Sequence, residues 1–453
     1  MEKLLDQSFS TDNFRKIFDY ENRKGQHLEG KFFPEIEKIT KNLKNFSLEF
    51  RELENKRPKI SKQLYEEERA KINKNKNDLK DHKERLLISE LEKISADILK
   101  KNFRITLQKV VTKNGKEAYK ISNDSASYFV IKQIQYNIKR LYKIQQGNRY
   151  NIICQLRSLM KDSFPKYIIR TDIKKFYESI SRNSLLNKIN KEHLLAMTSK
   201  KIIQQVLMSY KDLSHNDIGI PRGIGISAYL SEIYMRDFDK KIRSHPEIIF
   251  YARYVDDMVI VFSPKLNSNT TNFLSQIMSE AEKLDLTLNS NKTKTLDLRN
   301  LDLKNPQKDD LDYLGYRFCK DKTIQMGTEK IEKYKIKIER TFNAYIKGCK
   351  TKEKVARKIL VKRLKFLTGN TKLINNKKHV LVGIYFSNSL ITNTDCLDHL
   401  DEYLSKKISN ISCDRLKERL TKMSFKEGFL QKRFTKFSTT ELSKIVEVWK
   451  RVT

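Results

Sequence analysis

The sequence predicts an α+β fold in which helices flank an antiparallel sheet. Two short apolar strands, FYARYVD and DMVIVFS, follow each other directly, so they are expected to pair as a hairpin. Long stretches with helical spacing of apolar residues lie before residue 101 and after Thr328. At 453 residues the chain is longer than one ordinary core, which favours several domains.

The chain carries a large excess of positive charge. Its 92 Lys and Arg residues outnumber 56 acids, which gives a net charge of +36. This excess points to a polyanionic partner, with nucleic acid favoured over a charged membrane surface. The chain contains no run of about 18 apolar residues, and its start, MEKLLDQSFS, lacks an apolar signal core. We therefore expect a cytoplasmic protein without a membrane partner.

Cysteine usage excludes two further classes of protein. The five cysteines lie far apart and form no CxxC pair. Neither a zinc site nor a disulfide framework is therefore predicted.

The first 167 residues are predicted to form a helical part followed by a hairpin and more helix. Residues 52–100 are typical of long helices with one charged face. The stretch FRITLQKVVTKNGKEAYKIS alternates apolar and polar residues around Asn114-Gly115, a dipeptide that favours tight hairpin turns. Residues 128–160 then have helical spacing.

The central part of the chain is predicted to alternate strands and helices. The strand KYIIRTD ends on Asp172, and a helix is expected to begin near Arg182. A loop rich in Gly and Pro, GIPRGIGIS, precedes an amphipathic helix. After the hairpin, residues 271–288 are predicted as a helix, LTLNSNKTKTLDL as a strand with a loop, and DYLGYRF as a short strand.

From Thr328 onward the chain is predicted to be helical and basic. Between Lys330 and Lys365 there are fourteen Lys or Arg residues and three acids. Such a run is compatible with a solvated helix face and with a surface that contacts nucleic acid.

Three acids, Asp172, Asp256 and Asp257, are the candidate catalytic residues. Nucleotidyl transfer with two divalent metals needs carboxylates that hold the ions about 3.5 to 4 Å apart, and Mg²⁺ prefers such oxygen ligands. Asp172 and Asp256 are expected to bridge the ions, with Asp257 as a weaker or orienting ligand. Taken alone, the Asp-Asp pair is also compatible with a simple polar hairpin turn.

The order of the motifs in the chain resembles that of the reverse transcriptases. Their Asp-x-x-x-Phe-aromatic motif is matched by Asp172 with Phe176 and Tyr177, and Tyr-x-Asp-Asp is matched by 254–257. The resemblance implies a right-hand polymerase with fingers, a palm built on an antiparallel sheet, and a helical thumb. It also implies an enzyme, an RNA-directed DNA polymerase.

Three further motifs extend the resemblance over about 128–318. The Pro-Gln-Gly loop is matched by Pro221-Arg222-Gly223 followed by Ser227, although Arg222 replaces the usual Gln. Lys292-Thr293 matches the later Lys-Thr pair, and Leu314-Gly315 matches the Leu-Gly primer-grip turn.

The right-hand architecture predicts four parts along the chain. We expect an N-terminal helical extension over 1–100 and fingers over 101–167. The palm is expected over 168–318, with interleaved fingers helices at about 186–215. A helical thumb and C-terminal region is expected over 319–453.

The family's site residues are carried over position by position. Two Mg²⁺ ions, or Mn²⁺ in their place, would be held by Asp172, Ile173, Asp256 and Asp257. Lys292 would neutralise or protonate the leaving pyrophosphate, with Lys294 as an alternative. Tyr177 would be the gate that collides with a ribose 2′-hydroxyl and so favours deoxynucleotides, unless it is a packed core aromatic.

Binding residues follow from the same resemblance. The nucleotide would be contacted by Lys139, Arg140, Phe176, Tyr177, Pro221, Arg222, Gly223 and Ser227. The template and primer would be contacted by Arg149, Tyr254, Leu314 and Gly315. For the basic residues in these two sets, a solvated helix face is the alternative.

Within the family, the motifs resemble most the bacterial defence-associated reverse transcriptases of the abortive-infection and "unknown group" lineage. The type-three defence system, through its first polymerase, is the most similar type, and KFLTGN and VGIYFSN resemble its C-terminal region. This implies a bacterial antiphage enzyme that copies a partner non-coding RNA into DNA from dNTPs. A second polymerase subunit, or another copy of the chain, would be the protein partner.

Two other functions stay open on the residues alone. One is an RNA-binding scaffold whose catalytic core is vestigial, although the intact acids count against it. The other is template-independent or protein-primed DNA synthesis, for which the 20 tyrosines single out no priming residue.

Overall fold

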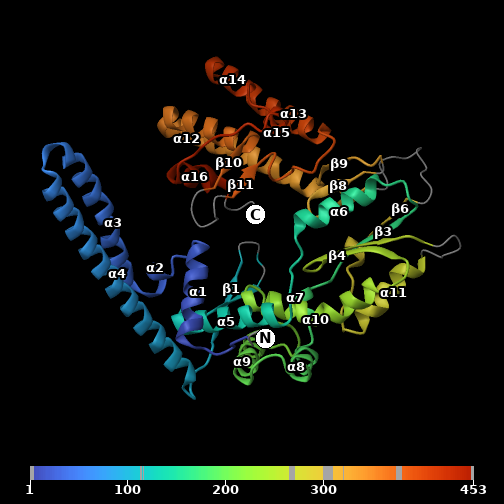
Figure 1. Ribbon diagram of the computed structural model, residues 1–453. Helices are drawn as coiled ribbons and strands as arrows, with labels where there is room; N and C mark the ends of the chain where they lie inside the picture. The colour runs from blue at the N-terminus through green and yellow to red at the C-terminus, as the bar shows by residue number, and fades with distance from the viewer. Residues whose placement is uncertain are drawn as a thin grey trace. The chain divides into compact units, whose positions relative to one another are not determined.

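The computed structural model shows that the chain forms two compact units (Figure 1). Unit 1 contains residues 1–144 and 181–233, and unit 2 contains residues 145–180 and 234–453. The structure describes residues 5–112, 115, 117–264, 271–298, 310–319, 321–373 and 380–449. The predicted α+β class is confirmed, whereas the finer division into four parts stays a prediction.

Unit 1 begins with four helices, which are α1 (Thr11–Arg23), α2 (Leu28–Phe32), α3 (Pro34–Lys56) and α4 (Lys62–Leu99). The long helices α3 and α4 pack on each other and are separated by a 3₁₀ turn, Arg57–Lys59, which contains Pro58. Proline cannot continue a helix that precedes it, and the Ser61 hydroxyl caps the new helix by accepting from the amide of Leu64.

The remaining part of unit 1 combines a hairpin with helices. The strands β1 (Leu107–Val111) and β2 (Glu117–Ile121) pair antiparallel, as predicted, while Asn114 of their connection lies outside the described residues. Three helices belong wholly to this part, α5 (Ser125–Leu141), α8 (Arg182–Lys191) and α9 (Met197–Ser214). Phe129 of α5 contacts Phe14 of α1 with ring centroids 5.5 Å apart, so the N-terminal helices share a core with α5.

The predicted single helical stretch over 128–160 is two helices. After α5 the chain leaves the helical conformation at Lys143, whose φ is 51°. A second helix, α6 (Arg149–Lys161), begins in unit 2, where the Asn148 side chain accepts hydrogen bonds from two of its first amides. The stretch QQGNRYN over 145–151 contains one aromatic residue, Tyr150, and includes Gly147 and Asn148. The sequence therefore carried a signal of the break, which the helical spacing on either side outweighed.

Unit 2 is built on a four-stranded antiparallel sheet. Its strands are β3 (Tyr167–Asp172), β4 (Ile248–Tyr254), β5 (Asp257–Phe262) and β6 (Lys294–Asp297), in the order β4-β5-β3-β6. One face carries Val259 and Val261, which share a core with residues of α6. On the other face Phe262 stacks on Phe273 of α11 (Thr271–Glu282), with ring centroids 4.1 Å apart. The helix α10 (Gly225–Arg243) runs from unit 1 into unit 2.

A second, three-stranded sheet follows the four-stranded sheet in the chain and precedes the C-terminal helices. Its strands are β7 (Leu311–Tyr313), β8 (Tyr316–Phe318) and β9 (Ile324–Met326). The stretch DYLGYRF was expected to be one short strand, but it forms two strands around a tight turn. The turn is made by Leu314 and Gly315, which both have positive φ.

The C-terminal region of unit 2 is mainly helical. Its long helix α12 (Thr328–Thr368) is kinked at Lys352. The other elements are β10 (Asn370–Lys372), β11 (Leu381–Gly383), α13 (Asp395–Ser409), α14 (Asp414–Thr421), α15 (Phe425–Leu430), α16 (Thr439–Val446) and the 3₁₀ turn Glu447–Trp449. The strands β10 and β11 pair as a two-stranded sheet. One continuous apolar core joins these helices to the four-stranded and three-stranded sheets of unit 2. No helix among the described residues is long and apolar enough to cross a membrane.

Candidate active site

The hairpin between β4 and β5 has a two-residue turn made by Val255 and Asp256. Tyr254 and Asp257 pair directly on either side of it. Val255 has a φ of 63°, a conformation that is strained for a β-branched residue. Such strain persists only where the surrounding structure imposes it, and it is found most often at functional sites.

The third acid comes from the neighbouring strand. Asp172 is the last residue of β3 and lies directly opposite Asp257 of β5. The amide of Ile173 donates to the carbonyl oxygen of Asp256 at 3.1 Å, which ties the end of β3 to the turn. The structure therefore brings Asp172, Asp256 and Asp257 together, as the strand pattern predicts.

Two basic side chains form ion pairs with the acids. Arg170 donates from Nε and Nη2 to the two carboxylate oxygens of Asp257, each at 3.0 Å. Lys292 donates from Nζ to Oδ2 of Asp172 at 2.9 Å, and Asn289 Nδ2 lies 3.4 Å from the same oxygen. Within the part of the chain that the structure describes, Asp256 forms no ion pair.

The electrostatics of the site disfavour three ionised acids without further cations. Burial raises the pKa of Asp256, and the nearby charge of Asp172 raises it further. Burial also raises the pKa of Asp257, against the opposing effect of the Arg170 guanidinium. The hydrogen bond to Asp172 raises the pKa of Lys292, so this lysine stays protonated.

The donor chemistry of the site fits a divalent cation. The described residues include no group of three or more His, Cys, Asp or Glu side chains already arranged around one metal position. Asp172 and Asp256 nevertheless supply the hard carboxylate oxygens that Mg²⁺ prefers, and their mutual repulsion is the kind that a cation relieves. Asp257 is the less available metal ligand, because its carboxylate forms an ion pair with Arg170.

Two of the predicted residues next to Asp172 are buried. Ile173 is almost fully buried and bridges to Leu288. Phe176 begins the short helix α7 (Phe176–Ser179) and is also buried, so it supports the site from the core. Tyr177 is half-buried, with its ring centroid 5.4 Å from that of Phe176.

The predicted Pro221-Arg222-Gly223 loop lies in unit 1, where it is held against β2. The amide of Tyr119 donates to the carbonyl oxygen of Arg222 at 2.8 Å. Ser227 donates from Oγ to the carbonyl oxygen of Pro221 at 2.6 Å. Gly223 has a φ of 98°, and a Cβ there would lie 2.9 Å from the Tyr119 carbonyl oxygen. The loop therefore requires glycine at this position.

The predicted primer-grip residues form a cluster in unit 2. Arg149 donates from Nε to the carbonyl oxygen of Leu314 at 2.8 Å. Its guanidinium and the Lys330 ammonium both lie over the Tyr316 ring, 5.7 and 5.5 Å from its centroid. Gly315 accepts at its carbonyl oxygen from the amide of Gly327 at 3.1 Å, which fixes the turn.

Some residues of these clusters were not predicted as site residues. Arg170 could have been found, because it lies two positions before Asp172 and so faces the same side of the strand. Asn289 and Lys330 carry no comparable signal. Lys330 is largely buried, and burial lowers its pKa to about 7, with the nearby charge of Arg149 acting in the same direction.

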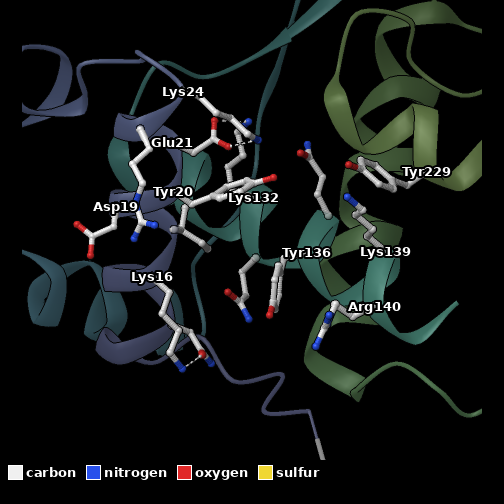
Figure 2. Close-up of a pocket in the computed structure, with 15 residues that line it drawn as sticks. Lys16, Asp19, Tyr20, Glu21, Lys24, Lys132, Tyr136, Lys139, Arg140 and Tyr229 are labelled. Carbon is white, nitrogen blue, oxygen red and sulfur yellow. Dashed lines mark hydrogen bonds and ion pairs between the residues drawn. The ribbon is translucent and has the colours of Figure 1, made fainter. Parts of the chain in front are cut away.

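The two remaining basic residues of the nucleotide set, Lys139 and Arg140, lie in the last turn of α5 in unit 1. They line a cavity that α5 forms with α1 (Figure 2). The remaining predicted contact, Tyr254, is 39% exposed beside the strained turn.

Comparison with known protein families identifies the domain. Residues 98–318 match the sequence profile of the family described as reverse transcriptase (RNA-dependent DNA polymerase). This stretch is a reverse transcriptase domain. It begins about 30 residues before the region in which the motifs were recognised, and it includes the β1–β2 hairpin.

The domain is that of an RNA-directed DNA polymerase, which is a nucleotidyltransferase, so the chain is an enzyme by its domain. Reverse transcriptase domains generally use divalent metal ions. No curated protein matches the chain in sequence.

Several solved structures are similar to this chain. Telomerase from Candida albicans in complex with a TWJ fragment of telomeric RNA is 14% identical, with 70% of this chain and 54% of that chain covered and a TM-score of 0.33. Apo telomerase from Candida tropicalis is 12% identical, with 77% and 61% covered and a TM-score of 0.37. The chain thus spans between half and two thirds of the length of these telomerase chains.

Proposed function

We propose that the protein is an RNA-templated DNA polymerase whose active site is formed by Asp172, Asp256 and Asp257. The observation that carries this proposal is the pairing of Asp172 with Asp257 across β3 and β5, with Asp256 in the adjoining strained turn. This arrangement concentrates carboxylates at one end of a rigid sheet, which is where a polymerase needs its cations held.

The reaction joins a primer to an incoming deoxynucleotide. The 3′-hydroxyl of the primer loses its proton to solvent, and its oxygen forms a bond to the α-phosphorus. The bond from this phosphorus to the bridging oxygen breaks, and pyrophosphate leaves. Two Mg²⁺ ions, or Mn²⁺ in their place, when bound by Asp172, Ile173, Asp256 and Asp257, supply charge neutralisation for the phosphates and acidify the hydroxyl.

The residues of the chain then have separate parts in this reaction. Asp172 and Asp256 hold the cations, and Arg170 orients Asp257 through its two hydrogen bonds. Lys292 neutralises or protonates the leaving pyrophosphate, and its raised pKa keeps it charged for this role. Lys294 is the alternative donor in this position.

Selection of substrate is assigned to residues of the other motifs. Tyr177, supported by Phe176, favours deoxynucleotides by colliding with a ribose 2′-hydroxyl. The loop Pro221-Arg222-Gly223, with Ser227, contacts the nucleotide or the template base. Arg149, Tyr254, Leu314 and Gly315 contact the template and primer.

The biological role follows from the motif resemblance. The protein acts in bacterial antiphage defence, in the cytoplasm, and copies a partner non-coding RNA into DNA. A second polymerase subunit or a second copy of the chain completes the assembly. The four-part division into extension, fingers, palm and thumb belongs to the same proposal.

Purification from cells that carry the native locus tests this function. The co-purifying nucleic acid is sequenced, and labelled dNTPs are then supplied with Mg²⁺ to the wild-type protein and to Asp256→Ala. We expect one defined RNA and complementary DNA that Asp256→Ala does not make. Bound RNA with no acid-dependent synthesis would instead favour an RNA-binding scaffold, and DNA that is not complementary to it would favour untemplated or protein-primed synthesis.

A further inference from the structure

Unit 1 contains a cavity whose wall includes none of the three acids of the candidate active site. Its volume is about 520 Å³, which lies within the range of small-molecule sites. Residues of α1 and α5 make most of its wall, and Tyr229 of α10 completes it (Figure 2). All the residues that line it belong to unit 1.

The wall of this cavity carries an excess of cations. Its charged residues are Lys16, Arg23, Lys24, Lys132, Lys139 and Arg140 on the basic side and Asp19 and Glu21 on the acidic side. The two acids are already neutralised from within the protein. Glu21 is buried and pairs with Lys24 at 3.0 Å and with Lys132 at 2.8 Å, and Asp19 pairs with Arg15.

Four cations of the wall are therefore left without an acid. Among the described residues, Lys16, Arg23, Lys139 and Arg140 form no ion pair, and Lys16 Nζ donates only to the Asn13 side chain at 3.3 Å. Two of them come from α1 and two from the end of α5. Four unpaired cations around one hollow are an arrangement that suits a phosphate-bearing ligand.

The same cavity offers aromatic faces. Tyr20 is 52% exposed and Tyr136 is 44% exposed. The Lys24 ammonium lies over one face of the Tyr20 ring, 3.8 Å from its centroid, so a base can stack only on the other face of this ring. Tyr229 is half-buried, and burial raises the pKa of its hydroxyl. Figure 2 shows Tyr136 between the side of the cavity that bears Tyr20 and Lys16 and the side that bears Lys139 and Arg140. Planar bases stack on such rings.

A side-chain amide is also available in the wall. Gln135 of α5 is half-buried and forms no hydrogen bond within the described residues. Its Nε2 occupies the space next to Gly225, where a Cβ would lie only 2.5 Å away. The position of the amide therefore depends on the absence of a side chain at residue 225. An amide donates and accepts, and so can pair with the edge of a base.

The geometry points to a nucleotide-binding pocket in unit 1, formed by Lys16, Tyr20, Arg23, Tyr136, Lys139 and Arg140. Its ligand is a phosphate joined to a planar base, either as a free nucleotide or as one unit of a single-stranded RNA. Lys139 and Arg140 also belong to the predicted nucleotide-contacting set, so the inference deepens the proposed polymerase function by adding residues of α1, and for these two residues it rests on that proposal. Its test measures binding without synthesis.

Direct binding to the full chain tests the pocket without divalent metal and without dNTPs. The probes are ATP and a labelled oligouridylate of about eight residues, a length within single-strand site sizes. The test variant is the double substitution Lys16→Glu with Arg23→Glu, since both side chains are exposed and unpaired. Lys71→Glu with Lys74→Glu on α4 is the matched control, because it makes the same charge change at exposed positions outside the cavity.

We expect the double substitution on α1 to weaken binding by about tenfold or more relative to the control, because two phosphate contacts are lost. Weakened binding of both probes, with ATP competing against the RNA, assigns the pocket to free nucleotides. Weakened binding of the RNA alone assigns it to a strand. Equal affinities of the two double variants for both probes would overturn the proposal.

A second substitution separates a nucleotide from a simple anion. Tyr20→Ala is expected to weaken binding by about fivefold or more, whereas Tyr20→Phe keeps the ring and the affinity. If Tyr20→Ala binds as well as the wild-type protein, the base-stacking part of the proposal is wrong. Loss of polymerase activity with binding intact would count against the proposed function alone.

Discussion

Arg170 is the residue that most directly stabilises the acid cluster. Arg170 and Asp257 are both largely buried, and the guanidinium makes two hydrogen bonds to the carboxylate. Arg170→Met leaves Asp257 as a buried charge without a cation, so it should lower the free energy of unfolding by about 3 kcal/mol. Urea-induced unfolding measures this loss.

The double variant Arg170→Met with Asp257→Asn provides the control for this prediction. Asparagine carries no charge, so the second substitution should recover part of the stability lost in the first. If the two substitutions are simply additive, the ion pair does not carry the effect.

The lowered pKa of Lys330 predicts that the free energy of unfolding depends on pH. Burial lowers its pKa to about 7 in the folded protein, whereas the unfolded value is about 10.4. Between these values the unfolded chain binds more protons, so the free energy of unfolding due to this group rises with pH and levels off above about 10.4. Below pH 7 the full penalty of a buried ammonium is present.

Comparison of the wild-type protein with Lys330→Met across pH 6 to 10 checks this dependence. The difference in unfolding free energy between the two should favour the variant most at the acid end, about pH 6, and shrink as the pH rises. A difference that is constant over the range would mean that Lys330 titrates normally.

At the scale of single elements, the loop at Gly223 is held by backbone geometry. Its φ of 98° and the 2.9 Å approach of a Cβ to the Tyr119 carbonyl oxygen both disfavour a side chain. Gly115→Ala is a matched control, because Gly115 has a φ of 72° and nothing within 4 Å of a Cβ. Gly223→Ala should cost about 2 kcal/mol more than Gly115→Ala in thermal unfolding.

Equal costs at the two glycines would contradict this account of the loop. Both substitutions introduce the strain of a positive φ. Only the one at Gly223 also brings a methyl group onto a backbone oxygen of β2. Equal costs would therefore show that the loop moves away from β2 with no measurable loss of stability.

The elements of the four-stranded sheet could be predicted from sequence because their signals are local. Apolar runs ending on Asp172 and flanking the Asp256-Asp257 pair are sufficient to place β3, β4 and β5. The break between α5 and α6 was missed although Gly147 and Asn148 mark it, because the helical spacing before and after these residues was read as one stretch. The turn at Leu314-Gly315 was recognised by resemblance, but the two strands around it were predicted as one, because strands of three residues give too short a pattern.

Contacts between distant residues could not be predicted from the sequence. Arg149 and Leu314 are 165 positions apart, and only the fold brings the guanidinium to that carbonyl oxygen. The cavity of unit 1 is a similar case. Its α5 cations Lys139 and Arg140 were compatible with a solvated helix face in the sequence, and the lack of acid partners around the cavity is visible only in three dimensions.

For the whole molecule, the net charge of +36 predicts a strong dependence of RNA binding on salt. The helix α12 supplies a large share of this charge, and Lys354 and Lys358 are exposed on it. If α12 contacts RNA phosphates, the double variant Lys354→Ala with Lys358→Ala should reduce the slope of log affinity against log salt by about 1.4.

The double variant Lys71→Ala with Lys74→Ala on α4 is the comparison for this slope. It removes the same charge from another exposed helix. A slope that falls equally in both double variants would mean that net charge alone, and no contact surface on α12, governs binding.

The central claim is that the acids at the β3 and β4–β5 strand ends catalyse nucleotide addition. Its most direct test is primer extension on a defined RNA template with dNTPs and Mg²⁺, comparing Asp256→Asn with Asp285→Asn. Asp285 is an exposed acid of unit 2 with a φ of 55°, which asparagine also adopts readily. The account predicts wild-type extension by Asp285→Asn and a loss of at least about a thousandfold in Asp256→Asn. Extension by Asp256→Asn at a rate near that of Asp285→Asn would contradict it.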